Sequence, residues 1–431
     1  MPTRLTNSSN CVRARKILEA MNLLPLEQAR AAIGARCVPL PSKPLLVPIQ
    51  QALGRIAGRD VLANLDVPPH DNSAMDGFAF AHADLAQHFG SGTWRPPIAD
   101  KRLAGAAKSA RCPTGQCVRV MTGAVMPEGT DTVIAQELVQ VHGDVATWPA
   151  DSVAAGANRR RRGEDLKRGE AVIGAGRLLR PADLGLLASL GQSKVAVRPR
   201  LRVAFFSTGN ELRQPGDRLD PGCIYDSNRY TMGAMLQTLG VEALDHGMVP
   251  DDPKALRQTF LRAAKHADVV ITSGGVSVGE ADHTKQVMRD MGSVDFWQLA
   301  IQPGRPMAFG ALGNGTVLFG LPGNPVAVMV TFYALVRPAL LALMGATQEN
   351  PAGFHAIAGE VIKKKPGRTE FRRGIVWRSD QATWTVRTTG GMGSGILRSM
   401  SQANCLIELG PDVTGALPGE LLSVWPFDGL T

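Results

Sequence analysis

The segment 268–282, DVVITSGGVSVGEAD, combines residue types that could hold an oxyanion beside a metal ion. Its first five residues have the β-branched composition of a buried strand. The glycines that follow leave backbone N–H groups uncovered, and such groups can form an anion-binding nest. The hydroxyls suit hydrogen bonding, and the carboxylates suit a hard divalent cation. The polar and glycine residues are Ser273, Gly274, Gly275, Ser277, Glu280 and Asp282.

The same segment also suits an ordinary loop between a strand and a helix. It matches neither the GxGxxG pattern nor the GxxxxGK phosphate loop. A functional interpretation therefore needs support from other parts of the chain.

Carboxylates recur at glycine-rich turns and predicted strand ends along the chain. A single acid of this kind is typical of a helix cap or a solvated surface. Six attached to such loops favour one shared site for a metal and a phosphate. These acids are Asp76, Asp165, Glu211, Asp226, Asp251 and Asp282.

Two further segments could bind anions. The turn Pro322–Pro325 opens a long apolar segment with helical character, and a helix N-terminus attracts negative charge. Pro322, Gly323 and Asn324 are therefore candidate binding residues. Arg159–Arg162 stand beside a Gly-Glu-Asp corner that includes Asp165, which suggests a polyanion and its metal; a run of four arginines is also typical of a solvated surface.

Composition excludes several classes of protein. The chain has 431 residues with 44% apolar and 20% charged residues, which indicates an ordinary globular protein of about three or four domains. The net charge of +9 invites nucleic-acid binding, but only 5% of residues are aromatic and no basic run is interleaved with them. No apolar run looks long enough to span a bilayer, and no secretory signal is recognised. We therefore expect a cytoplasmic location.

The six cysteines are scattered without CxxC spacing. Neither a zinc site nor a disulfide framework is indicated. We expect free, buried thiols.

Strands and helices alternate between about residues 196 and 346. Strands are expected over 200–207 and 268–272, and helices from Tyr230, over 252–264 and in the long apolar segment that starts at the turn Pro322–Pro325. This alternation predicts a mostly parallel sheet covered by helices. Short strands separated by Gly and Pro predict a small β domain on either side of it in the sequence.

The fold class is therefore α/β multidomain. We expect a three-layer α/β domain, an inserted small β domain, an elongated helix and strand domain, and a β-barrel-like domain at the C-terminus. Helices are expected over 26–33 and around 49–56 in the elongated domain. The predicted parts are a polar extension (1–22), a discontinuous linking domain (23–62 and 155–195), the inserted β domain (63–154), the α/β domain (196–346) and the C-terminal β domain (350–427).

Seven motifs in register resemble the MoeA family of bacterial molybdopterin molybdenumtransferases. This family is related to the plant molybdenum-insertase domain and the E domain of gephyrin. The resemblance covers about residues 24–427. Its motifs are DNSAMDG (71–77), MTGAVMPEGTD (121–131), RRRGEDL (160–166), STGNEL (207–212), SGGVSVGEAD (273–282), PGRP (303–306) and LPGNPV (321–326).

The resemblance implies an elongated homodimer of four domains with active sites shared between subunits. It implies that Mg²⁺ and molybdate convert adenylylated molybdopterin into molybdenum cofactor with release of AMP. A molybdopterin adenylyltransferase would be the upstream partner. The residues that match the family's functional positions are Asp76, Thr122, Asp165, Glu211, Asp251 and Asp282.

The resemblance implies that Asp76, Thr122, Asp165 and Glu211 form the candidate catalytic set, and that the first three face the α/β cleft of the other protomer. Asp251 and Asp282 are the preferred Mg²⁺ ligands, because that ion takes hard oxygen ligands. The predicted substrate-binding residues are Ser273, Gly274, Gly275, Ser277, Lys285, Arg305, Pro322, Gly323 and Asn324.

The chain departs from the commoner family pattern at four positions. Asn210 stands where many relatives have Asp, so a neutral hydrogen-bonding group suffices there. Gln298 and Gln302 stand where relatives often have Lys, and Ala327 where they often have Ser. Two positive charges are therefore missing near the expected anion site, and Arg305 is the expected compensation. A divergent relative that binds molybdopterin, or acts as a scaffold without efficient metal insertion, is the alternative reading.

Overall fold

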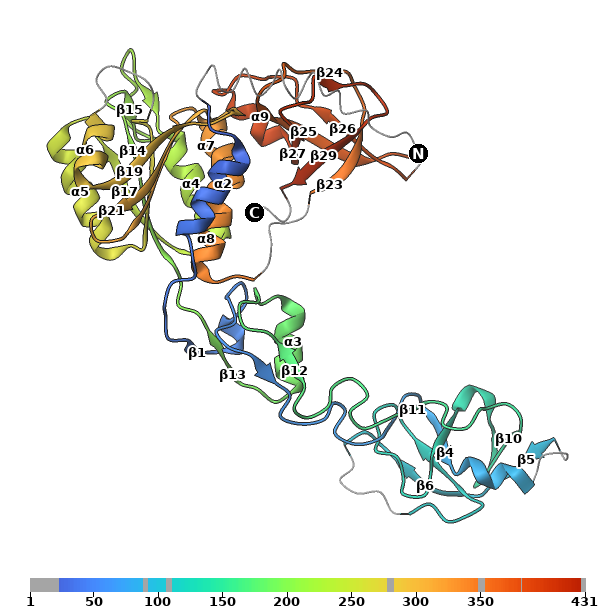
Figure 1. Cartoon of the computed structure of the whole chain (residues 1–431). Coiled ribbons are helices and arrows are strands. Elements are labelled where there is room, and N and C mark those ends of the chain that lie inside the picture. The colour runs from blue at the N-terminus through green and yellow to red at the C-terminus, as the bar shows by residue number, and fades with distance from the viewer. Residues whose placement is uncertain are drawn as a thin grey trace.

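The computed structural model describes residues 23–87, 92–105, 111–276, 283–347, 353–380 and 382–427. The molecule is elongated (Figure 1). A helix-covered sheet and a C-terminal β unit lie side by side at one end, and a second β unit lies at the other. A narrow segment of short strands and one helix connects the two ends.

A six-stranded sheet forms the centre of the end that also carries the C-terminal β unit, which we call the cleft end. Its strand order is β17-β14-β18-β22-β21-β19. The first four strands run parallel, and β21 and β19 form antiparallel pairs at the far edge. The mostly parallel sheet predicted from the sequence is therefore present. The strands are β14 (Arg202–Thr208), β17 (Glu242–Val249), β18 (Val269–Ser273), β19 (Gly292–Gln298), β21 (Pro306–Leu312) and β22 (Val317–Leu321).

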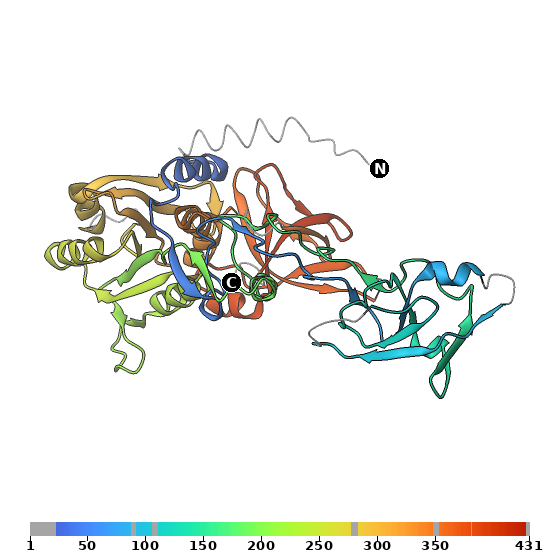
Figure 2. The same ribbon diagram turned by 90° about the horizontal axis from the view of Figure 1, so that it is seen from below.

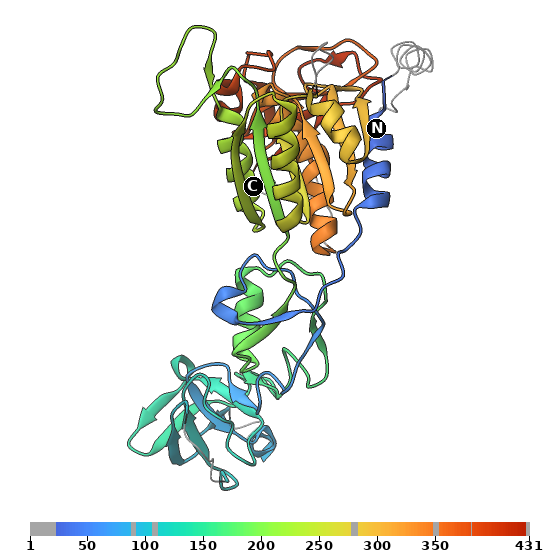
Figure 3. The same ribbon diagram turned by 90° about the vertical axis from the view of Figure 1, so that its left-hand side faces the viewer.

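Helices cover both faces of this sheet, which gives three layers (Figure 3). Alternation along β14 shows why: Val203 and Phe205 pack into one buried cluster, and Ala204 and Phe206 into another. The first cluster includes residues of α2, α4, α7 and α8, and the second includes residues of α5 and α6. The helices are α2 (Leu26–Arg36), α4 (Ser227–Thr238), α5 (Pro253–His266), α6 (His283–Met291), α7 (Pro325–Thr331) and α8 (Arg337–Met344).

A π-helical turn, Phe332–Val336, joins α7 to α8, so Pro325–Met344 is one continuous helix. It is long and apolar enough to cross a membrane, with a mean hydropathy of 2.0, which corrects the expectation that no such run exists. However, 78% of its most apolar window is buried within the protein. The apolar composition thus serves the core that α2 and α4 also line.

The C-terminal unit is a closed barrel. Five strands pair in a ring, β25-β26-β23-β29-β27, because β27 also pairs with β25. The strands are β23 (Phe354–Ala358), β25 (Thr369–Arg378), β26 (Trp384–Thr388), β27 (Cys405–Leu409) and β29 (Leu421–Pro426); β24 (Ile362–Lys363), β28 (Gly415–Ala416) and α9 (Leu397–Gln402) are added to it. A short strand, β20 (Ile301–Gln302), pairs with β25 and ties the barrel to the α/β unit.

The connecting segment contains two small antiparallel pairs, β1 with β13 and β2 with β12, and the helix α3. Its elements are β1 (Leu45–Pro48), β2 (Val61–Leu62), β12 (Ala171–Ile173), α3 (Pro181–Ser189) and β13 (Lys194–Val197). The helix expected around 49–56 is a single 3₁₀ turn, Ile49–Gln51. Gly54 has φ +69°, a left-handed conformation that ends helical backbone there.

The distal unit is built from a four-stranded and a three-stranded sheet. Phe80, Trp94 and Trp148 meet in its core with ring centroids 4.9–5.2 Å apart. Its elements are β3 (Asn72–Ser73), β4 (Gly77–Phe80), the 3₁₀ turn His82–Gln87, β5 (Thr93–Trp94), β6 (Ile98–Arg102), β7 (Cys117–Val120), β8 (Thr132–Ala135), the 3₁₀ turn Gln136–Leu138, β9 (Gln140–His142), β10 (Val145–Pro149) and β11 (Arg159–Arg160).

The cysteines in the described part of the chain are free. Cys37, Cys112, Cys117 and Cys405 are buried, and burial raises the pKa of the Cys37 thiol to about 11. The expectation of free, buried thiols is confirmed for these four.

Candidate functional site

A pocket of about 1050 Å³ opens at the carboxyl ends of β14, β18 and β22. Parallel sheets commonly bind ligands at this edge. Its walls come from the loops after these strands, from the arm that carries β15 (Leu212–Arg213) and β16 (Ile224–Tyr225), from the loop 301–306, and from the C-terminal barrel. The arm projects beyond the sheet in Figure 3.

The pocket brings together most of the residues predicted at the α/β cleft. Its walls include Glu211, Asp251, Ser273, Gly274, Gly275, Arg305, Pro322, Gly323 and Asn324. Ser277 and Asp282 lie outside the described residues. Lys285 lies on α6 and is not among the residues that line the pocket.

The two glycines after β18 are required by the local geometry. Gly274 and Gly275 have φ +92° and +65°. A Cβ atom on Gly274 would stand 2.6 Å from the Thr208 carbonyl oxygen, and one on Gly275 would overlap the Thr284 side chain. The loop can follow this path only without side chains at these positions.

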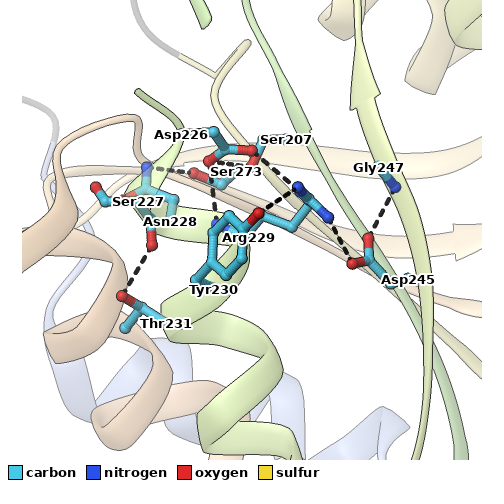
Figure 4. A network of polar contacts seen from close by, with 10 residues as sticks. All are labelled: Ser207, Asp226, Ser227, Asn228, Arg229, Tyr230, Thr231, Asp245, Gly247 and Ser273. Atoms are coloured by element: carbon cyan, nitrogen blue, oxygen red, sulfur yellow. Dashed lines mark hydrogen bonds and ion pairs between the residues drawn. The ribbon is translucent and has the colours of Figure 1, made fainter. Parts of the chain in front are cut away.

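Asn228, at the start of α4, links two of the pocket's loops. Its Nδ2 atom donates to Ser273 Oγ at 2.8 Å (Figure 4) and to the Gly323 carbonyl oxygen at 2.7 Å. The ends of β18 and β22 are thus held at a fixed separation by one amide group. Asn228 was absent from the sequence-based set because its role depends on contacts 45 and 95 residues away.

Asp226 anchors the first turn of α4 from a fully buried position (Figure 4). Its Oδ1 accepts from Ser207 Oγ at 3.0 Å and from the Arg229 N–H at 3.1 Å, as an N-cap residue does. The Arg229 guanidinium lies 3.5 Å from Oδ2 and is itself held by Asp245 at 2.7 Å. Asp226 therefore positions the pocket wall.

Asn210 accepts a hydrogen bond, as the neutral-group interpretation requires. Its Oδ1 atom accepts from the Asp251 backbone N–H at 3.0 Å. Either Asn or Asp can supply that oxygen. The loops after β14 and β17 are joined by this bond.

The C-terminal barrel contributes residues that the sequence did not predict. Arg368 and the segment 392–395 line the pocket. Ser394 accepts from Asn324 Nδ2 at 2.9 Å, and its carbonyl oxygen accepts from the Val326 N–H at 3.1 Å. Arg373, fully buried, donates to Ser399 Oγ at 3.0 Å and to the Gly391 carbonyl oxygen. The glycine-rich run 390–395 was the available signal for this loop.

Asp76, Thr122 and Asp165 lie in the distal unit and the segment that leads to it, not in the walls of this pocket. Thr122 donates to Asp76 Oδ1 from its backbone N–H at 2.7 Å and from Oγ1 at 2.8 Å. These two hydrogen bonds hold the pKa of the Asp76 carboxyl below its usual range. Asp76 is therefore a carboxylate that accepts hydrogen bonds.

The predicted arginine run is tied down by nearby acids. Arg159 pairs with Asp71, and Arg162 donates to Asp66 Oδ2 at 2.6 Å. The Arg162 backbone N–H also donates to Asp71 Oδ1 at 2.7 Å. At least these two arginines are therefore engaged by acids of the neighbouring loop that contains Asp66 and Asp71.

Carboxylates in the pocket suit a hard cation. Asp251 is half-buried and Glu211 is exposed, so both offer oxygens that Mg²⁺ accepts. Within the described ranges, no group of three or more His, Cys, Asp or Glu side chains could hold a metal alone. Mg²⁺ usually keeps waters and takes substrate oxygens, so a small carboxylate set fits it.

Three family models match consecutive parts of the chain. They are the MoeA N-terminal region (domain I and II) at residues 24–191, a probable molybdopterin binding domain at 204–342, and the MoeA C-terminal region (domain IV) at 355–427. Together they span nearly all of the described chain.

Full-length relatives give the same result. The chain is 41% identical over 409 residues to the molybdopterin molybdenumtransferase of Haemophilus influenzae, which covers 95% of this chain and 100% of the relative. It is 35% identical to molybdopterin molybdenumtransferase 2 of Mycobacterium tuberculosis, over 89% of this chain and 95% of the relative.

A solved structure of the molybdopterin biosynthesis MoeA protein from Pyrococcus horikoshii has a similar fold. Its TM-score is 0.80 at 28% identity, with 94% of this chain and 100% of that chain covered. On the three matched regions, the full-length identity and the shared architecture, the chain belongs to the MoeA family.

Proposed function

We propose that the protein acts in molybdenum cofactor biosynthesis as a molybdopterin molybdenumtransferase. It inserts molybdate into adenylylated molybdopterin and releases AMP in a reaction that requires Mg²⁺. The observation that carries this proposal is the pocket itself, which unites acids, a glycine loop and arginines at one sheet edge. Family membership and 41% identity to a molybdopterin molybdenumtransferase support the same activity.

The pocket's groups divide the work by charge. Molybdate is a dianion and the adenylylated substrate carries a pyrophosphate, so their approach needs neutralisation. The backbone at Gly275 and the Arg305 guanidinium would supply donors for oxyanions, while the Gly274 N–H and the Ser273 hydroxyl donate to the carbonyl oxygens of Leu321 and Pro322 and hold the loop in place. Bound Mg²⁺ would neutralise phosphate and molybdate oxygens. Asp251 and Glu211 would hold it, together with Asp282 from the sequence-based set.

We further propose that the active site is completed by a second copy of the chain. Asp76, Thr122 and Asp165 lie in or near the distal unit, and they do not line the pocket of their own chain. In a two-fold dimer, the distal part of one protomer would face the pocket of its partner. The carboxylates of Asp76 and Asp165 and the hydroxyl of Thr122 would then orient the substrate or a water molecule. We also propose that this protein makes a transient contact with the molybdopterin adenylyltransferase that supplies its substrate.

The test is AMP release from adenylylated molybdopterin by the purified protein, with and without molybdate and Mg²⁺. We expect release to need both, and Asp251→Asn to lower it about 100-fold or more, since it removes a metal ligand. Asp282→Ala should lower AMP release by a similar factor. Asp380→Asn, an exposed acid on the barrel, is the matched control. Release that ignores molybdate, or an Asp251→Asn variant as active as the wild type, would contradict the proposal.

A further inference from the structure

Arg368 on the C-terminal barrel lines the same pocket as Arg305 of the α/β unit. Neither guanidinium makes a hydrogen bond or an ion pair with another described residue. Elsewhere, Arg202 forms an ion pair with Asp268 at 2.8 Å. Two unpaired guanidiniums from different parts of the sequence therefore face one cavity.

Strand pairing fixes Arg368 beside the loop that carries Arg305. β20 and β25 run parallel, with Ile301 opposite Thr369 and Gln302 opposite Glu370. The Thr369 N–H donates to the Ala300 carbonyl oxygen at 2.9 Å. Arg368, immediately before β25, is thus held at the pocket wall by backbone hydrogen bonds between the two units.

The nearest acid along the strand is already neutralised. Glu370 is buried and forms an ion pair with Arg372. The Lys364 ammonium, buried nearby, donates to the carbonyl oxygens of Lys365 and Val413 at 3.1 and 3.0 Å. The charge of Arg368 therefore remains available to a ligand in the pocket.

Gln302 is exposed and lines this pocket. The pairing of Gln302 with Glu370 puts it two positions from Arg368 across the β20–β25 ladder. We propose that Arg368 and Arg305 together bind a tetrahedral oxyanion between the α/β unit and the barrel. The inference rests on the proposed function for the identity of that oxyanion.

Two oxyanions share this chemistry: free molybdate and the phosphate of the adenylylated substrate. Calorimetric titration of the full-length protein with sodium molybdate, and separately with AMP, distinguishes them. We expect Arg368→Gln to weaken one of the two about tenfold, since a charge-assisted hydrogen bond is lost. Arg368→Lys, which keeps the charge, should lose less than about threefold. The weakened anion identifies the ligand.

Two further variants test whether charge is the cause. Gln302→Lys added to Arg368→Gln should restore most of the lost affinity, because it returns a cation to the same wall. Arg378→Gln is the matched control, since Arg378 is exposed at the far end of β25, donates to the Ala382 carbonyl oxygen and is not among the residues that line the pocket. It should change neither affinity. Melting temperature is measured for every variant, and we expect no change for Arg368→Gln.

The inference is overturned if neither anion binds, if Arg368→Gln binds both as the wild type does, or if Arg378→Gln is equally weakened. Failure of the proposed function has a different signature. A wild-type protein that binds molybdate through Arg368 but releases no AMP would remove the proposed reaction and leave the anion site. A protein that releases AMP while Arg368→Gln binds normally would remove the inference alone.

Discussion

At the cleft end, the exposed side chains of Glu211 and Arg305 face a pocket, whereas at the distal end Asp76 is held by two hydrogen bonds from Thr122. Asp71, close to it in sequence, is likewise bound by Arg159 and the Arg162 backbone. At the cleft end, the side chains of Glu211 and Arg305 thus line a pocket that a ligand can enter. In the distal loops, the carboxylates accept hydrogen bonds from backbone and side-chain groups of neighbouring loops. In the single chain, Asp71 and Asp76 are therefore carboxylates oriented by the hydrogen bonds that they accept.

The first prediction tests whether the two ends are independent structures. Phe80→Ala should destabilise the distal unit by about 3–5 kcal/mol, because it opens a cavity beside Trp94 and Trp148. Hydrogen exchange should rise in residues 72–149 and stay unchanged in residues 202–321. Phe260→Ala, a buried ring against Phe206, should do the reverse. Equal loss of protection at both ends would show a single cooperative unit.

The second prediction tests whether the ends meet between subunits. Asp165→Asn and Glu211→Gln should each lower AMP release about 100-fold. If one site uses Asp165 of one protomer and Glu211 of the other, an equal mixture of reassociated variants should recover about a quarter of wild-type activity, since random pairing of a two-fold dimer leaves that share of sites intact. A mixture as inactive as its components would place both residues in the same chain's site.

The third and smallest prediction concerns the distal carboxylate. Thr122→Val removes the Oγ1 donor but keeps the backbone N–H, so the Asp76 pKa should rise only part of the way towards its ordinary value. Because the folded pKa is depressed, the stability linked to it is present above the ordinary carboxyl pKa and is lost as pH falls through the folded pKa. Carboxyl NMR titration measures this shift. An unchanged Asp76 pKa in the variant would show that the hydroxyl contributes nothing.

Much of the fold followed from patterns within short segments. Alternating strands and helices after residue 196 predicted the sheet, and short strands separated by turns predicted the β units at either end. The prediction of a helix around residues 49–56 was wrong. Apolar spacing alone does not reveal that Gly54 adopts a left-handed backbone conformation, which ends helical structure there. The boundaries of the linking domain stay a prediction. The helix α2, which the sequence analysis placed in that domain, packs with α8 in the core of the α/β unit.

Local sequence patterns were enough to select the residues of the cleft loops, because glycines, hydroxyls and acids stand next to one another where strands end. Gly274, Gly275 and Asp251 could be chosen for that reason. Only the tertiary structure showed that Asn228 joins two loops and that the barrel brings Arg368 and Ser394 to the same pocket. The two Asn228 contacts join residues 45 and 95 positions apart in the sequence. Contacts over such separations depend on how whole units pack together, as where β20 pairs with β25 of the barrel, and local residue spacing does not reveal them.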